Sequence, residues 1–181
     1  MTFAKTPFKL KVAMSDILEN AEANLSPRMR NLVSLLWSEW KDLEQQIVGM
    51  NQEIEQIASS DPSCQRLRQI PGIDPLVATA IVAAIGNGAA FHRGREFSSW
   101  LFGISKRGNR YLRKLLVHGA RSAVLRVKRE RSPFGPWLDT LEARAPIKVV
   151  VTAAASKLAR IAWVVLSSGQ DYRAAVNSVA A

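Results

Sequence analysis

The stretch LRQIPGIDPLVATAIVAAIG, residues 67–86, holds the clearest local structure signals in this chain. A short helix ends at its Pro-Gly pair, because these two residues punctuate helices. Asp74 can cap a second helix that starts with Pro75, where the missing N–H of proline costs nothing. Gly86 ends that helix. The stretch therefore predicts two helices joined by a tight turn.

The same pattern is typical of a helix-hairpin-helix, which we place at residues 66–86. Its turn, Pro71, Gly72 and Ile73, would expose backbone N–H groups near a helix N-terminus, which suits a phosphate oxygen. The usual motif has glycine where Asp74 stands, and a carboxylate there repels phosphate unless it turns inward to cap the helix. A tight turn between packed helices, with no ligand, explains the pattern equally well.

A long helix precedes this stretch. Ser26 is its expected N-cap, Pro27 its first residue, and Ser59 to Pro62 its end. Apolar residues recur along it at alternating spacings of four and three: Met29, Val33, Leu36, Trp40, Leu43, Ile47, Met50, Ile54 and Ile57. Such a seam predicts coiled-coil packing. It could pair between chains or fold back on its own chain, and we favour pairing between chains.

Strand signals are almost absent, since 148–152 is the only β-branched run, so we predict an all-α fold. Residues 1–25 form a lead-in with one weak helix, and residues 26–60 are the long helix. A helical domain follows at 61–172, with the helix-hairpin-helix at 66–86 and a basic loop and helix at 103–131. Residues 173–181 are expected to form a flexible tail.

Charge is distributed unevenly. The 181-residue chain has 25 Lys and Arg against 15 Asp and Glu, a formal net charge of +10. Between Arg93 and Arg131 lie twelve basic residues and two acidic ones, so all the excess falls in this segment. From Met14 to Asp61 the balance is negative. A concentrated basic block favours a polyanion partner, because neutralised phosphates release counterions. A basic face without a ligand is the alternative.

The basic segment also predicts a helix with two different sides. Leu112, Leu115, Leu116, Ala120, Ala123, Val124 and Val127 recur at helical spacing and would form its buried stripe. Arg110, Arg113, Lys114 and Arg121 lie off that stripe, as expected for a helix lying along a nucleic acid backbone. The predicted DNA-binding residues are Pro71, Gly72, Ile73, Lys106, Arg107, Arg110, Arg113, Lys114 and Arg121.

Other classes of function find little support. Cys64 is the only cysteine, which excludes an internal disulfide and fits a reducing cytoplasm. His92 and His118 are far apart, so a structural zinc site is not expected. No targeting segment is visible, and the apolar stretch 147–166 is interrupted by charges such as Lys157 and Arg160, which we expect to reach out of a mostly buried helix. We expect a protein of the bacterial cytoplasm, near the nucleoid, without membrane contact.

Several blocks now carry a resemblance. They are IPGI at 70–73, FSSWL at 97–101, GISKRGNRYLR at 103–113, VHGAR at 117–121 and KLARIAW at 157–163. In this order they resemble the C-terminal half of insertion-sequence transposases of the IS116/IS110/IS902 type, in the IS1111 branch. The resemblance runs from about Leu10 to Tyr172. The GISKRG and KLARIAW blocks are specific, whereas the Pro-Gly hairpin alone is not.

The resemblance implies a DNA recombinase guided by a structured RNA. Members have a RuvC-like domain with an Asp-Glu-Asp-Asp site for Mg²⁺, then a coiled coil and a domain with a catalytic serine. This chain starts just before the coiled coil, so the metal site is missing and we expect no cofactor. Leu101-Phe102-Gly103 joins blocks that the family separates by its serine segment, so the chain is read as truncated and internally deleted. We assign no catalytic residue, and Ser105 is not promoted to nucleophile, because no His, Asp or Glu lies close to it in sequence.

Three hypotheses follow. The first is a DNA-binding transposase remnant without catalysis, in which guide RNA is a further possible partner. The second is an active subunit completed by residues from another subunit. The third is a regulator that pairs with intact transposase through the Met29–Ile57 helix.

Overall fold

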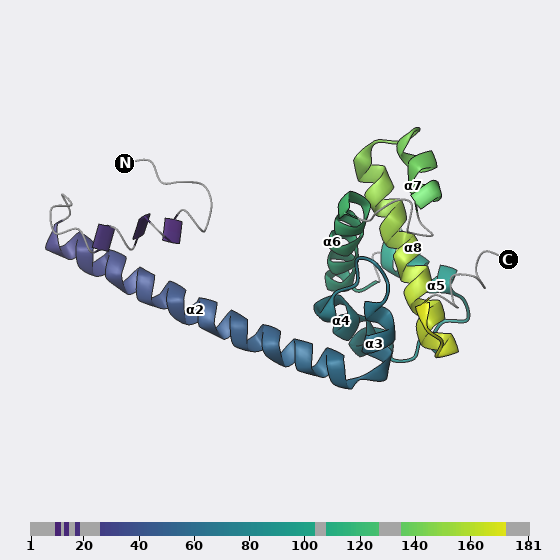
Figure 1. Cartoon of the computed structure of the whole chain (residues 1–181), viewed down its shortest axis with the longest axis horizontal. Coiled ribbons are helices and arrows are strands. Elements are labelled where there is room, and N and C mark those ends of the chain that lie inside the picture. The colour runs from purple at the N-terminus through teal and green to yellow at the C-terminus, as the bar shows by residue number, and fades with distance from the viewer. Residues whose placement is uncertain are drawn as a thin grey trace. The chain divides into compact units, whose positions relative to one another are not determined.

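A computed structural model describes residues 10–11, 13–14, 17–18, 26–103, 108–126 and 135–172. Every regular element among these residues is helical, which confirms the all-α prediction (Figure 1). The chain divides into two compact units, Met1–Gln52 and Glu53–Ala181. The predicted flexible tail, 173–181, lies outside the described residues, as does most of the lead-in.

Helix α2, Pro27–Ser60, is the longest element. Its start is fixed by Ser26, whose Oγ accepts a hydrogen bond from the Met29 backbone nitrogen at 3.3 Å, as expected of an N-cap. In the first unit a described part of the lead-in returns along it, because Lys11 Nζ lies 2.6 Å from Glu44 Oε2. The helix that carries the predicted seam is therefore partly covered by its own chain.

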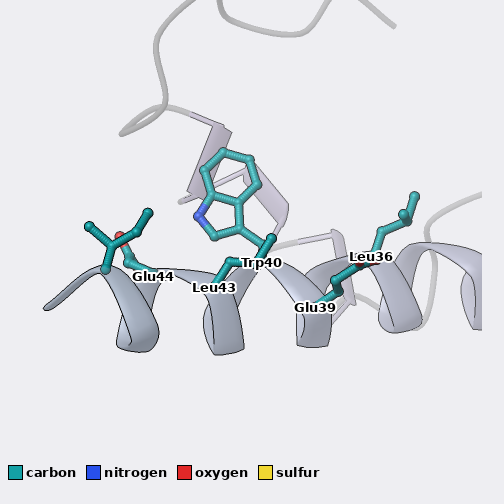
Figure 2. Close-up of a pocket in the computed structure, with 6 residues that line it drawn as sticks. Leu36, Glu39, Trp40, Leu43 and Glu44 are labelled. Atoms are coloured by element: carbon teal, nitrogen blue, oxygen red, sulfur yellow. The ribbon is translucent and has the colours of Figure 1, made fainter. Parts of the chain in front are cut away.

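Much of the seam is nevertheless exposed. Leu36, Leu43, Ile47 and Met50 are each more than half exposed. Within the first unit, Leu36, Trp40, Leu43 and Ile47, with Glu39 and Glu44, line an open groove of about 450 Å³. Figure 2 shows the Trp40 indole standing out from the helix beside Leu43. Such an apolar face on a helix is what a coiled-coil partner covers.

The second unit is built on α8, Ile147–Ser168, the most buried helix of the described chain. It follows Pro146 and ends at Gly169, which has a φ of +66°. By length and composition it is the one described helix that could cross a membrane, yet it lies within this packed unit and more than half of its apolar window is buried. It contacts α3, α5, α6 and α7. We therefore describe α8 as a core helix.

Five further described helices complete the unit: α3 (Pro62–Arg68), α4 (Pro75–Ile85), α5 (Gly94–Phe102), α6 (Arg110–Arg126) and α7 (Gly135–Glu142). Of these, α4 packs mainly on α3 and α6. The core of the unit is formed by side chains such as Leu67, Ile81, Phe97, Leu112 and Leu158. Trp163 of α8 ties down the segment between α4 and α5, since its Nε1 donates to the Gly88 carbonyl at 3.0 Å. Gly88 has a φ of +78° there, a conformation that favours glycine.

Candidate nucleic-acid interface

The Pro-Gly turn joins α3 to α4. The Ile73 nitrogen donates to the Ile70 carbonyl at 3.0 Å and closes the turn, in which Gly72 has a φ of +91°. Asp74 accepts a hydrogen bond from the Val77 nitrogen at 2.8 Å, so its carboxylate caps α4. The predicted cap is therefore present, although Asp74 itself remains exposed.

The turn packs against α6 backbone to backbone. A Cβ atom on Gly72 would lie 2.5 Å from the Gly119 carbonyl oxygen, and one on Gly119 would overlap the Gly72 carbonyl. Only glycine, whose side chain is a hydrogen atom, therefore fits at either position. Close packing therefore accounts for both glycines whether or not the turn has a ligand.

Ile73 serves the core. Its side chain is buried and its N–H already bonds to Ile70, so neither is available to DNA. Ile73 is therefore a packing residue rather than a candidate contact. Pro71 and Gly72 are half-buried and stay in the set.

Helix α6 has the predicted division into two sides. Leu112, Leu116, Ala120 and Val124 are buried, Leu115 and Ala123 are half-buried, and Val127 lies outside the described residues. Asn109 caps the helix, because its Oδ1 accepts from the Leu112 nitrogen at 3.0 Å. The apolar spacing thus fixes which side of α6 faces the unit.

Three cations share one exposed face of α6. Arg110, Lys114 and Arg121 are exposed, and their separations of four and eleven residues equal about one and three turns of a helix. We call these residues the α6 stripe. Within the described part of the chain, none of the three lies within ion-pair distance of a carboxylate. Among the described residues, therefore, no carboxylate compensates the positive charge that the stripe presents to solvent.

Arg113 has a different role. It is half-buried, and its Nε donates to the Leu101 carbonyl oxygen in the last turn of α5 at 2.5 Å. A cation at that end of a helix also interacts favourably with the helix dipole. Arg113 thus joins α6 to α5, and we leave it out of the contact residues as well.

The turn and the stripe lie on different flanks of α6. Gly119 is two residues before Arg121, which at 3.6 residues per turn places it about 160° around the helix from Arg121, nearly opposite the stripe. Lys106 and Arg107, the predicted contacts in the basic loop, lie outside the described residues, as does Ser105. The loop ends are held near α5, since a Cβ atom on Gly108 would overlap the Trp100 carbonyl.

The described residues do not fit a catalytic metal site. No group of three or more His, Cys, Asp or Glu residues among them could hold a metal ion. Cys64 is a free, buried thiol; burial, followed by its hydrogen bond to Asp61, raises its pKa to about 12. It is therefore a neutral thiol in the core rather than a nucleophile.

Two arginines escaped the sequence-based prediction of contacts. Arg95 of α5 and Arg160 of α8 line one pocket with three serines. On each helix the pocket residues are spaced three or four apart, so the sequence alone could have shown that they share one face of that helix. The meeting of the two faces could not be found in this way, because they lie far apart in the sequence.

Comparisons with known proteins point in one direction. The model of the transposase IS116/IS110/IS902 family matches residues 64–101, the segment from α3 to α5. The transposase for insertion sequence element IS1111A of Coxiella burnetii is 31% identical over 96% of this chain and 52% of its own length. A "Probable family 20 transposase" of Pseudomonas aeruginosa is 34% identical over 88% of this chain and 52% of its own.

A third relative, the transposase for insertion sequence element IS1328 of Yersinia enterocolitica, is 33% identical over 82% of this chain and 49% of its own length. The chain spans about half the length of the curated relatives it matches. The alignment with the Coxiella relative runs over 188 residues although the whole chain has 181, so that relative carries residues within the aligned region that have no counterpart here.

Proposed function

Since the chain belongs to the IS116/IS110/IS902 family of transposases, we propose that it binds DNA in transposition without cutting it. The observation that carries the proposal is the α6 stripe, in which Arg110, Lys114 and Arg121 face solvent from one side of a packed helix. Phosphate contacts from such side chains hold a duplex without reading its sequence. The bacterial cytoplasm, near the nucleoid, is the corresponding location.

Two further groups belong to the proposed interface. Lys106 and Arg107 come from the basic loop that leads into α6. Pro71 and Gly72 would contribute the hairpin turn, as in a helix-hairpin-helix. Because the turn lies on another flank of α6 than the stripe, a ligand that reaches both must extend across the exposed side of the helix.

Inactivity is the second part of the proposal. The longer alignment of the Coxiella relative agrees with an internal segment that this chain lacks. The resemblance places the catalytic serine of the family in such a segment, between Trp100-Leu101 and the block that begins at Gly103.

The α2 seam supports a third part of the proposal, pairing with a second chain. Exposed apolar residues such as Leu36, Leu43 and Met50 would be covered in a dimer of this chain. An intact transposase subunit that carries the same seam would be an alternative partner, and the chain would then act as an inhibitor. A pull-down of the full-length relative by this chain would distinguish the inhibitor from the dimer.

The stripe is tested by the triple variant Arg110→Gln, Lys114→Gln, Arg121→Gln. Its affinity for mixed-sequence duplex should fall for every sequence alike, and the slope of log affinity against log salt should drop by about 0.9 per lost phosphate contact. The matched control is Arg126→Gln, Arg144→Gln, Lys148→Gln, which removes the same charge from exposed positions of the second unit outside the stripe. Equal binding by the two triple variants would refute the stripe as the DNA contact.

Inactivity is tested with supercoiled plasmid, Mg²⁺ and a structured RNA from the same element. The parent chain should leave the plasmid intact. Strand cleavage that Ser105→Ala abolishes would instead show an active enzyme, completed by another subunit.

A further inference from the structure

A pocket of about 350 Å³ lies where α5 crosses α8, outside the residues assigned so far. From α5 it is lined by Arg95, Ser98 and Ser99, which are three and four residues apart and so share one face. From α8 it is lined by Ser156 and Arg160, one turn apart. Figure 1 shows the two helices that form it.

The packing of the two helices holds this pocket in shape. Gly94 starts α5 directly against α8, since a Cβ atom there would lie 3.0 Å from the Arg160 carbonyl oxygen. Further along, the hydroxyl groups of Ser98 and Ser156 lie 2.7 Å apart and share a hydrogen bond. These two contacts, at the start and in the middle of α5, therefore fix the distance between the arginine-bearing faces.

The charge in the pocket is positive and uncompensated among the described residues. The lining contains two guanidinium groups and no carboxylate. Glu96, the acidic residue of α5, accepts instead from the His92 nitrogen at 2.9 Å. On α8, burial and then the charge of Arg160 lower the pKa of the neighbouring Lys157.

Arg160 also has unused hydrogen-bonding capacity. Its Nε is buried, and no described residue accepts its hydrogen. A buried donor without an acceptor costs about 1–3 kcal/mol, so such a group usually has a partner. An anion in the pocket would supply the acceptor.

We propose that this pocket binds a phosphate group through Arg95, Arg160, the hydroxyl group of Ser99 and the one hydroxyl group of the Ser98–Ser156 pair whose proton is not used between them. Guanidinium groups pair with two phosphate oxygens at once, and serine hydroxyl groups donate to the others. The volume admits a phosphate that is still part of a strand. Gly103 also lines the pocket, and in the sequence it directly precedes the basic segment with the predicted contacts Lys106 and Arg107.

This inference rests on the proposed DNA binding for its source of phosphate, because a DNA strand and free inorganic phosphate share the same chemistry. The first experiment addresses DNA. Ser99→Asp places a negative charge in the pocket at an exposed position, and Ser167→Asp makes the same change at an exposed position outside it. Duplex affinity should fall by about tenfold more in Ser99→Asp than in Ser167→Asp, since a charge-assisted contact is lost. Equal losses would overturn DNA as the ligand of the pocket.

The second experiment addresses inorganic phosphate, without DNA. The buried Nε–H of Arg160 should give an NMR signal that Arg160→Lys removes and that therefore identifies it. Phosphate should shift this signal in the parent chain, less in Arg95→Gln, and chloride at equal ionic strength should not. If phosphate does not change the chemical shift of this signal, the pocket is not an anion site.

The two experiments separate the two proposals. A parent chain that binds no DNA but whose Arg160 signal responds to phosphate would refute the proposed function and support the pocket. The opposite result has three parts: the α6 stripe variant loses DNA affinity, Ser99→Asp binds DNA as well as Ser167→Asp, and phosphate does not shift the Arg160 signal. It would support the proposed function and refute the pocket.

Discussion

Gly72 of the Pro-Gly turn and Gly119 of α6 meet backbone to backbone, with no room for a Cβ atom on either residue. This contact fixes the turn against the helix that carries the basic stripe. Because the contact by itself requires glycine at both positions, the two glycines indicate close packing and do not by themselves indicate DNA binding.

Gly119→Ala should lower the free energy of unfolding by about 2–3 kcal/mol, because the overpacking cost exceeds the better helix propensity of alanine. The control is Gly169→Ala, where φ is +66° and ψ is 10° and no atom lies within 4 Å of the added Cβ. That change should cost only the strain of the backbone, about 1 kcal/mol. Urea denaturation followed by circular dichroism measures both, and equal losses would contradict a packing role for Gly119.

Arg113→Ala should destabilise the second unit by about 1.5–3 kcal/mol, because it removes a charged donor from the Leu101 carbonyl. The adjacent Lys114→Ala should change stability by less than about 0.5 kcal/mol, since Lys114 is exposed. DNA affinity should show the reverse order once both variants are compared well below their unfolding temperatures. A stable Arg113→Ala variant that binds DNA weakly would restore Arg113 to the interface.

Cys64 should resist thiol reagents at pH 8 in the folded chain and react rapidly in urea. Burial keeps its pKa at about 12, so the thiolate is scarce in the native state. An Ellman's reagent assay with and without urea gives the two rates. Similar rates would show that the core opens readily around α3.

The same pKa shift predicts a loss of stability at high pH. The pKa of the thiol in the unfolded chain is about 8.5. Above that pH the native state binds more protons than the unfolded state, so the free energy of unfolding falls as the pH rises toward 12. The stabilisation from this group is fully present below about pH 8. Cys64→Ala should flatten the decline of the urea midpoint between these limits, and an unchanged slope would contradict the assignment.

Replacing Leu36 and Leu43 of α2 by Glu should abolish self-association, because two charges would enter the apolar groove. The control Gln45→Glu, Gln46→Glu makes the same change in charge off the predicted seam. Light scattering after size exclusion measures the mass of each. A parent chain that is monomeric at micromolar concentrations would argue that the seam has no second copy as partner.

Local signals in the sequence determined the helices and their ends. Ser26 and Asp74 cap the helices they precede, and Gly169 ends α8, because each acts on backbone groups within a few residues. Apolar spacing likewise determined the buried side of α6. The positive charge of the basic segment is a property of composition alone.

The tertiary structure decided what those helices do together. Ser98 and Ser156 share a hydrogen bond across 58 residues of sequence, and Gly72 meets Gly119 across two other helices. It also turned Ile73 into a core residue and Arg113 into a link to α5, although both had looked like contacts for DNA. Spacing along one helix reports which residues share a face. Which faces then meet depends on how side chains of distant segments fill a common core, and no local pattern carries that information.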